Sequence, residues 1–209
     1  AAKRKRLLVY HSIVGSATGA FGYFANQVGL ESTYIVPKAA TRWQIMELDD
    51  RADANLYVND VAISVETEDN GNPNTDPWTD SQLDELVAIG VFVCTSPDFD
   101  VPAQLADGPY GSGIGYHSMW GSPSPWTPAI GKTCPGTVRI AQFKTIVLPR
   151  IIAAVTAPPE GFLMALTDAE QAELLERVRN MHAGNFLGGD LTWLDSHLVC
   201  VISALSTSG

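Results

Sequence analysis

Leu7-Leu8-Val9-Tyr10-His11-Ser12, near the start of the chain, is the stretch of sequence that decides the fold. Its four consecutive apolar residues predict a short strand that is buried within a sheet. The apolar run ends at His11, and the segment that follows, residues 12–22, is rich in glycine. A histidine at the end of a buried strand can point from the sheet into a cleft. The stretch therefore predicts both a sheet strand and a candidate functional side chain.

Further apolar segments predict the rest of the sheet and the helices around it. We expect strands over residues 33–36, 43–48 and 60–66. Helices are expected over residues 18–24, over residues 81–89 with Thr79 as N-cap, and from Pro135 to near Pro149. Strands mixed with helices in this way predict an α/β fold with a single mixed central sheet flanked by helices.

The character of the sequence changes after Pro158-Pro159. Thr167 and Glu170 form a capping-box pattern at the start of an amphipathic helix expected over residues 166–181. Residues 184–189 resemble a linker, and residues 191–205 form a second apolar segment. We therefore predict a main domain over residues 1–157 and a C-terminal helical extension or linker over residues 158–209.

Composition excludes several classes of function. The chain has 209 residues and a formal net charge of −10, so it lacks the clustered basic surface that a nucleic-acid groove needs. The one basic cluster, residues 3–6, lies ahead of the first strand. We expect no transmembrane segment, since no stretch approaches the roughly 20 apolar residues that cross a bilayer, and no secretory signal peptide is recognisable.

Two histidines and one cysteine stand in suggestive positions. His117 follows Gly115-Tyr116, and Cys134 precedes Pro135-Gly136. Taken singly, His11, His117 and Cys134 each have an ordinary structural explanation, and their long spacing matches no compact zinc motif. Chemically, however, two imidazoles and one thiolate leave the fourth position of a tetrahedral zinc open for water, as in a catalytic site. From spacing alone, both readings stay open.

The three cysteines are an odd number far apart in the sequence and do not form a disulfide framework. Cys94 and Cys200 lie in apolar surroundings, so we interpret both as packing residues.

The sequence motifs around these residues resemble those of a known family. Val9-Tyr10-His11-Ser12, Gly113-Ile114-Gly115-Tyr116-His117 and Gly131-Lys132-Thr133-Cys134-Pro135-Gly136 occur in that order. They resemble the zinc-dependent N-acetylmuramoyl-L-alanine amidases related to peptidoglycan recognition proteins. The wording is nearest to the amidase modules in endolysins of phages that infect actinobacteria. The resemblance covers about residues 6–152.

The resemblance implies a zinc site with one ion per chain. In that family two histidines and a cysteine, or an aspartate in some branches, bind the metal, and these positions match His11, His117 and Cys134. The family lysine two residues before the last ligand matches Lys132. Its cation is expected to stabilise the negative charge that develops in the transition state.

The resemblance also implies a residue that takes the proton of the attacking water. Some branches rely on a tyrosine and others on a glutamate, and this chain offers Tyr34 and Glu66 at the matching positions. We favour Glu66 as general base and Tyr34 as an orienting hydroxyl, although the choice between them stays open. Where many relatives have a Trp-His pair, this chain has Arg51-Ala52-Asp53-Ala54-Asn55, so substrate contacts there cannot be carried over.

The function that the resemblance implies is hydrolysis of the amide bond between N-acetylmuramic acid and L-alanine in peptidoglycan. The chain is then expected to be the lytic module of a phage endolysin, a monomer made in the host cytoplasm that acts on the cell wall. The alternative is a peptidoglycan-binding module without turnover. Members that only bind tend to lack the third ligand, so Cys134 favours the enzyme.

Overall fold

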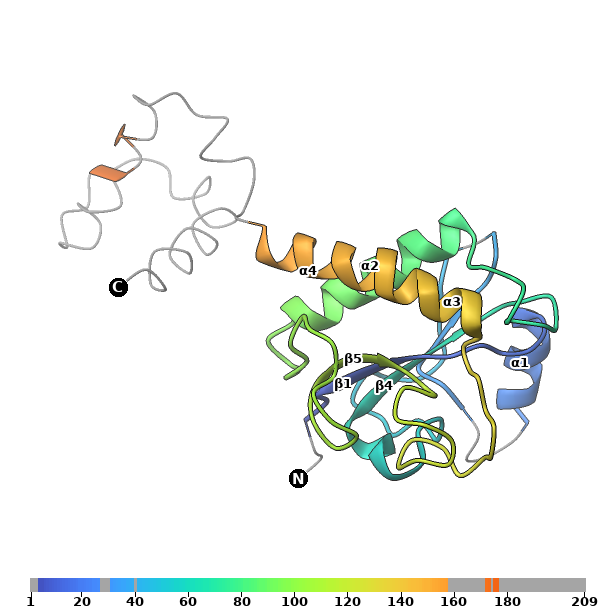
Figure 1. Cartoon of the computed structure of the whole chain (residues 1–209). Helices are drawn as coiled ribbons and strands as arrows, with labels where there is room; N and C mark the ends of the chain where they lie inside the picture. Colours follow the sequence, from blue (N-terminus) through green and yellow to red (C-terminus); the bar gives the residue numbers. More distant parts are fainter. Residues whose placement is uncertain (1–3, 27–30, 40, 158–171, 174, 177–209) are drawn as a thin grey trace. The chain divides into compact units, whose positions relative to one another are not determined.

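The computed structural model of the protein describes residues 4–26, 31–39, 41–157, 172–173 and 175–176 (Figure 1). The chain divides after Ala157, and nearly all described residues belong to the unit Ala1–Ala157. The helix expected over residues 166–181 lies largely outside the described residues, and the linker at 184–189 and the segment 191–205 lie entirely outside them. The role of residues 158–209 therefore stays a prediction.

The first unit alternates strands and helices along the chain. Its strands are β1 (Leu7–Tyr10), β2 (Tyr34–Val36), β3 (Trp43–Gln44), β4 (Ala62–Thr67) and β5 (Gly113–Tyr116). Its α-helices are α1 (Ala17–Phe24), α2 (Asp80–Thr95), α3 (Thr137–Gln142) and α4 (Leu148–Thr156). A 3-10 helix, η1 (Leu56–Val61), precedes β4, and a π-helical turn, η2 (Phe143–Val147), joins α3 to α4. Among the described residues, none of these helices has both the length and the apolar character needed to cross a membrane.

The five strands form one mixed sheet in the order β3-β2-β4-β1-β5. β1 lies between β4 and β5 and is parallel to both, and only β3 runs antiparallel to its neighbour. The mixed central sheet expected from the sequence is therefore confirmed. One strand, β5, was not among the four expected.

Helices α2, α3 and α4 cover one face of the sheet (Figure 1), where the largest hydrophobic cluster lies. Leu8 and Tyr10 of β1 point into this cluster, and Leu7 and Val9 point to the opposite face, as strand alternation requires. The opposite face carries two smaller clusters, one around the fully buried Trp126 and one that includes Ile35 of β2. His11 belongs to this second face, because it continues the series of Leu7 and Val9.

The helical segment after Pro135 differs from expectation. It does not end near Pro149 but continues as α4 to Thr156. Proline lacks an N–H and is tolerated in the first turn of a helix, where that group needs no partner. The π-helical turn immediately before α4 places Pro149 in such a first turn.

Candidate metal centre

Three parallel strands bring the first site residues together. His11 follows β1, His117 follows β5, and Glu66 lies near the end of β4. Because β1 is parallel to both neighbours, the carboxyl ends of these strands meet at one edge of the sheet, the usual ligand site of open α/β sheets. The rings of His11 and His117 lie with their centroids 4.3 Å apart.

Cys134 reaches the same place on a long loop. Its backbone carbonyl accepts hydrogen bonds from the N–H and hydroxyl of Ser118, the residue after His117, at 3.1 and 2.7 Å. Its sulfur accepts a hydrogen bond from the backbone N–H of Ser12, the residue after His11, at 3.3 Å. Each ligand segment is thus tied to the next. One potential ligand atom from each of the three residues lies within 4.8 Å of the others, so this buried group could hold a metal ion.

Hydrogen bonds fix which ring nitrogen each histidine turns inward. His11 Nε2 lies 2.9 Å from Asn55 Oδ1, and His117 Nε2 lies 2.8 Å from the backbone carbonyl of Trp126. Both partners are oxygen acceptors, so each Nε2 must carry the proton and each Nδ1 keeps its lone pair. Nδ1 of His11 lies 4.0 Å from the sulfur of Cys134. Outer hydrogen bonds of this kind orient histidine ligands in metal sites.

The donor set fits a zinc ion. Two imidazole nitrogens and one sulfur are the ligands that zinc prefers, and three of them leave one position open. His117 Nδ1 is buried and has no hydrogen-bond partner among the described residues. An inward-facing lone pair of this kind is unfavourable in a protein interior unless a cation or a donor meets it.

The pKa values of the two histidines are those that metal ligands need, whereas the pKa of Cys134 is not. Burial, together with the neighbouring charges, holds the pKa of His11 well below its ordinary value and lowers that of His117 to about 4. Both rings are therefore neutral near pH 7, as metal ligands must be. Burial raises the pKa of the Cys134 thiol to about 12. A bound metal ion would offset that effect, because it deprotonates a coordinating thiol.

Glu66 is the carboxylate beside this group. Its Oε1 lies 3.8 Å from His11 Nδ1, and its Oε2 is buried without a hydrogen-bond partner among the described residues. Burial raises the pKa of Glu66 to about 7, while Lys132 lowers it and Asp69 raises it further. A carboxylate with such a pKa can exchange a proton near neutral pH.

Lys132 is exposed on the loop that carries Cys134. Its positive charge lowers the pKa values of His11, His117, Glu66 and Cys134. An effect on all four side chains places the ammonium within electrostatic range of the whole group.

Tyr34 is the predicted site residue that the structure keeps apart. It pairs with Val65 across β2 and β4, and both side chains belong to the cluster beneath α2. The charge that acts on its hydroxyl is that of Arg42, which pairs with Glu85 of α2. Glu66, one residue after Val65, points to the opposite face. The structure therefore does not bring Tyr34 together with the metal group, since the sheet separates the two, and its role as an orienting hydroxyl stays a prediction.

A groove of about 390 Å³ opens beside Glu66. The turn between β1 and α1 and the exposed side of α1 line it, with Ile13, Val14, Tyr23 and Phe24 as its apolar walls. A substrate with an apolar or weakly polar segment could thus lie next to the metal group.

One residue of the centre, Asn55, carries no signal in the sequence. Asn55 is fully buried, holds His11 through Oδ1 and donates from Nδ2 to Ser64 Oγ at 2.5 Å. It falls in the segment where the resemblance breaks down, and no local pattern marks it out.

Gly136 lets the loop that carries Cys134 pack closely against the backbone of Pro73. Its φ is +110°, and a Cβ there would lie 2.2 Å from the backbone oxygen of Pro73. We expect Gly136→Ala to lower the free energy of unfolding by about 2–5 kcal/mol through backbone strain and overpacking. Gly131→Ala is the matched control in the same loop, since φ is +70° but nothing lies within 4 Å of the added Cβ. It should lose only about 1–2 kcal/mol. Chemical denaturation measures both, and equal losses would contradict the close contact.

Comparisons with known proteins give likenesses in structure only. No family model and no curated protein sequence matches the chain. The structure is similar to the N-acetylmuramoyl-L-alanine amidase LysC from Clostridium intestinale URNW, with 15% identity, 66% of this chain and 81% of that chain covered, and a TM-score of 0.48. It is similar to a selenomethionine derivative of AmpD, at 21% identity, 70% and 86% coverage and a TM-score of 0.46. The amidase AmiD from E. coli, in complex with a muropeptide substrate, matches at 19% identity, 45% and 44% coverage and a TM-score of 0.39. At these identities and TM-scores, the likenesses carry no evidence about function.

Proposed function

We propose that the protein is a zinc-dependent amidase that cleaves the bond between N-acetylmuramic acid and L-alanine in bacterial peptidoglycan. One observation carries the proposal: the buried group of His11, His117 and Cys134, with both Nδ1 lone pairs turned inward, lies beside a carboxylate with one oxygen that no described residue meets. The sequence motifs around the three residues resemble those of muramoyl-alanine amidases, and the proposed substrate rests on this resemblance.

The residues of this chain divide the work of amide hydrolysis among them. His11, His117 and Cys134 would hold the zinc ion, which when bound acts as a Lewis acid toward water and the amide carbonyl. Glu66 takes a proton from the attacking water and passes it to the departing amine, a role that its position in the groove and its pKa of about 7 support. Lys132 stabilises the negative charge that develops on the carbonyl oxygen.

The groove beside Glu66 would hold the part of the substrate next to the cleaved bond. Its walls are largely apolar and aromatic, and Glu66 is the carboxylate that lines it. Such a lining suits an uncharged segment of sugar or peptide rather than a polyanion.

The finer parts of the proposal follow from the resemblance. The protein binds one zinc per chain, acts as a monomer, and serves as the lytic module of a phage endolysin, made in the host cytoplasm and acting on the cell wall. The competing function is a binding module of the same fold without turnover. The unpartnered Glu66 oxygen favours the enzyme, because a module that only binds needs no buried carboxylate beside its metal.

Digestion of purified peptidoglycan tests the proposal. We expect new alanine N-termini to appear without new reducing sugar ends, to stop when a chelator removes the metal, and to return when zinc is added back. Reducing ends would indicate a glycosidase instead. Sedimentation of the protein with peptidoglycan that remains uncleaved would support the binding module.

A further inference from the structure

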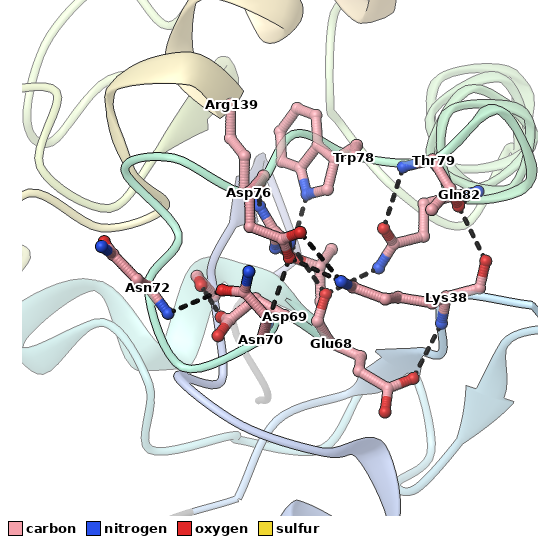
Figure 2. A network of polar contacts seen from close by, with 12 residues as sticks. Lys38, Glu68, Asp69, Asn70, Asn72, Asp76, Trp78, Thr79, Gln82 and Arg139 are labelled. Carbon is pink, nitrogen blue, oxygen red and sulfur yellow. Dashed lines mark hydrogen bonds and ion pairs between the residues drawn. The ribbon is translucent and has the colours of Figure 1, made fainter.

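A fully buried arginine lies behind the metal group, outside the residues that face the substrate groove. Arg139 of α3 has no exposed side-chain area. Its guanidinium donates to the backbone carbonyls of Asp76 and Glu68, at 2.7 and 2.9 Å, and to Oδ2 of Asp76 at 3.1 Å. Figure 2 shows Arg139 beside Asp76, Trp78 and Glu68 in this polar network. The arginine thus joins α3 to the segment that follows β4.

The fourth contact of Arg139 leads to the metal group. Nη1 donates at 2.8 Å to the hydroxyl of Thr67, the last residue of β4, which also accepts from Trp78 Nε1 at 2.9 Å. The same hydroxyl donates to the backbone carbonyl of His11 at 2.6 Å. Arg139 is therefore connected to a candidate metal ligand through one buried hydroxyl.

The direction of the Thr67 proton is determined by its neighbours. A hydroxyl has one proton and two lone pairs. Arg139 and Trp78 can only donate through the groups that meet Thr67, so they take both lone pairs and leave the proton to the carbonyl of His11. Because the chain of bonds starts at a cation in a buried site, each bond polarises the next.

The position of Arg139 in the sequence links this chain of hydrogen bonds to Cys134 as well. Arg139 follows Cys134 by five residues, and α3 begins directly after the Cys134-Pro135-Gly136 turn. Anchoring α3 therefore anchors Cys134. The carbonyl of His11 is held by the same anchor through Thr67. His11 and Cys134 lie 123 residues apart in sequence, yet the segments that carry them are held in place by the same guanidinium.

We propose that Thr67 and Arg139 are positioning residues that set the separation of His11 and Cys134, and hence the metal affinity and coordination geometry of the centre. The inference rests on the proposed function, since it concerns the metal centre described there. Neither residue belongs to the candidate metal ligands or to the groove lining.

The test is a pair of substitutions at Thr67 with zinc affinity as the readout, measured by competition with a chromophoric chelator. Thr67→Val keeps the shape and removes the hydroxyl, and we expect it to weaken zinc binding roughly 10–100-fold, as loss of an outer partner of a ligand does. Thr67→Ser retains the hydroxyl and should bind within about threefold of the wild type. The visible spectrum of the Co(II)-substituted protein should change in Thr67→Val and return in Thr67→Ser.

Val65→Ala is the control for a general loss of stability. It removes two methyl groups from the same strand, but its side chain lies on the α2 face. It should lower the melting temperature and leave zinc affinity and the Co(II) spectrum unchanged. If Thr67→Val does not fold, zinc affinity is measured in Arg139→Lys instead. Lysine keeps the positive charge but lacks the several planar N–H donors of the guanidinium, so zinc binding should weaken by roughly tenfold.

The outcomes separate this inference from the proposed function. Wild-type zinc affinity and an unchanged Co(II) spectrum in a folded Thr67→Val, or in Arg139→Lys, would overturn the inference and leave these residues a purely structural role. A wild-type protein that binds zinc but releases no muropeptides would contradict the proposed function, while the comparison of affinities would still decide the inference. A wild-type protein that binds no zinc would overturn both.

Discussion

Cys134→Ser is expected to abolish zinc binding and to lower the rate of muropeptide release by about 1000-fold or more, since it removes a ligand and not merely an outer partner. The serine hydroxyl is neutral, whereas the thiolate of Cys134 supplies the one negative charge among the three candidate ligands. Two neutral imidazoles would then be the remaining ligands, with no anionic ligand to balance the charge of the metal. Zinc content per chain and the rate of release are the two measurements.

Stability gives a second readout of the same substitution. A ligand that binds only the folded state stabilises it by about 2.7 kcal/mol when present at 100 times its Kd. The wild type should therefore melt at a higher temperature when zinc is added, and Cys134→Ser should not respond. Cys134→Asp should respond in part, because aspartate retains an anionic ligand.

Cys94→Ser is the matched control. Cys94 is the other described free cysteine, half-buried in α2 on the far side of the sheet. It should keep one zinc per chain and the full rate of release. Full zinc content and full activity in Cys134→Ser would show that sulfur is not a ligand and would remove the basis for the proposed metal centre.

The metal ligands could be predicted from the sequence because local patterns mark them. The apolar run before His11 predicts a buried strand ending at an imidazole, and the words around His117 and Cys134 carry a family resemblance. The structure places these three residues in one group, in agreement with the expectation. Their meeting depends on parallel pairing across the sheet, which the short strands before His11 and His117 make possible.

The side of the sheet on which Tyr34 lies could not be predicted in the same way. β2 is buried on both faces, so its residues are aromatic or aliphatic throughout and show no polar alternation. A shift of one position moves a side chain from one face to the other. In β4 the alternation is visible, since Ser64 and Glu66 are polar and Ile63 and Val65 are not. That contrast marks the face of Glu66 correctly, whereas nothing in the sequence marks the face of Tyr34.

Two further features depend on contacts between distant segments. β5 was not expected because glycine is unfavourable in strands. A Cβ at Gly115 would lie 2.8 Å from the ring of Trp126, so the glycine is needed for packing against a residue eleven positions later. Asn55 contacts His11 across 44 residues and belongs to an irregular segment. Tertiary contacts of this kind leave no periodic signal in the chain.

Glu66→Gln is expected to lower kcat by about 100- to 10,000-fold, the usual contribution of a general acid–base residue, with KM within about threefold of the wild type. Glutamine has nearly the same shape, so the groove and the metal ligands should keep their places. Zinc content should stay at one per chain. Glu66→Gln thus removes proton transfer and keeps metal binding, whereas Cys134→Ser removes both. Steady-state kinetics on a soluble muramyl peptide gives kcat and KM.

The stability of the metal-free protein gives an independent test of the Glu66 environment. Burial raises the pKa of Glu66 to about 7, so the folded state disfavours the carboxylate. An acid with a raised pKa destabilises the fold above its unfolded value of roughly 4.3 and has no such effect below it. Metal-free Glu66→Gln should therefore be more stable than the wild type at pH 8, and the difference should vanish at pH 4.

Glu85→Gln, on α2, is the control that removes a carboxylate elsewhere, and it should leave kcat unchanged. A Glu66→Gln variant with wild-type kcat would exclude Glu66 as the base, and with Tyr34 on the far face the proton would have to leave through solvent.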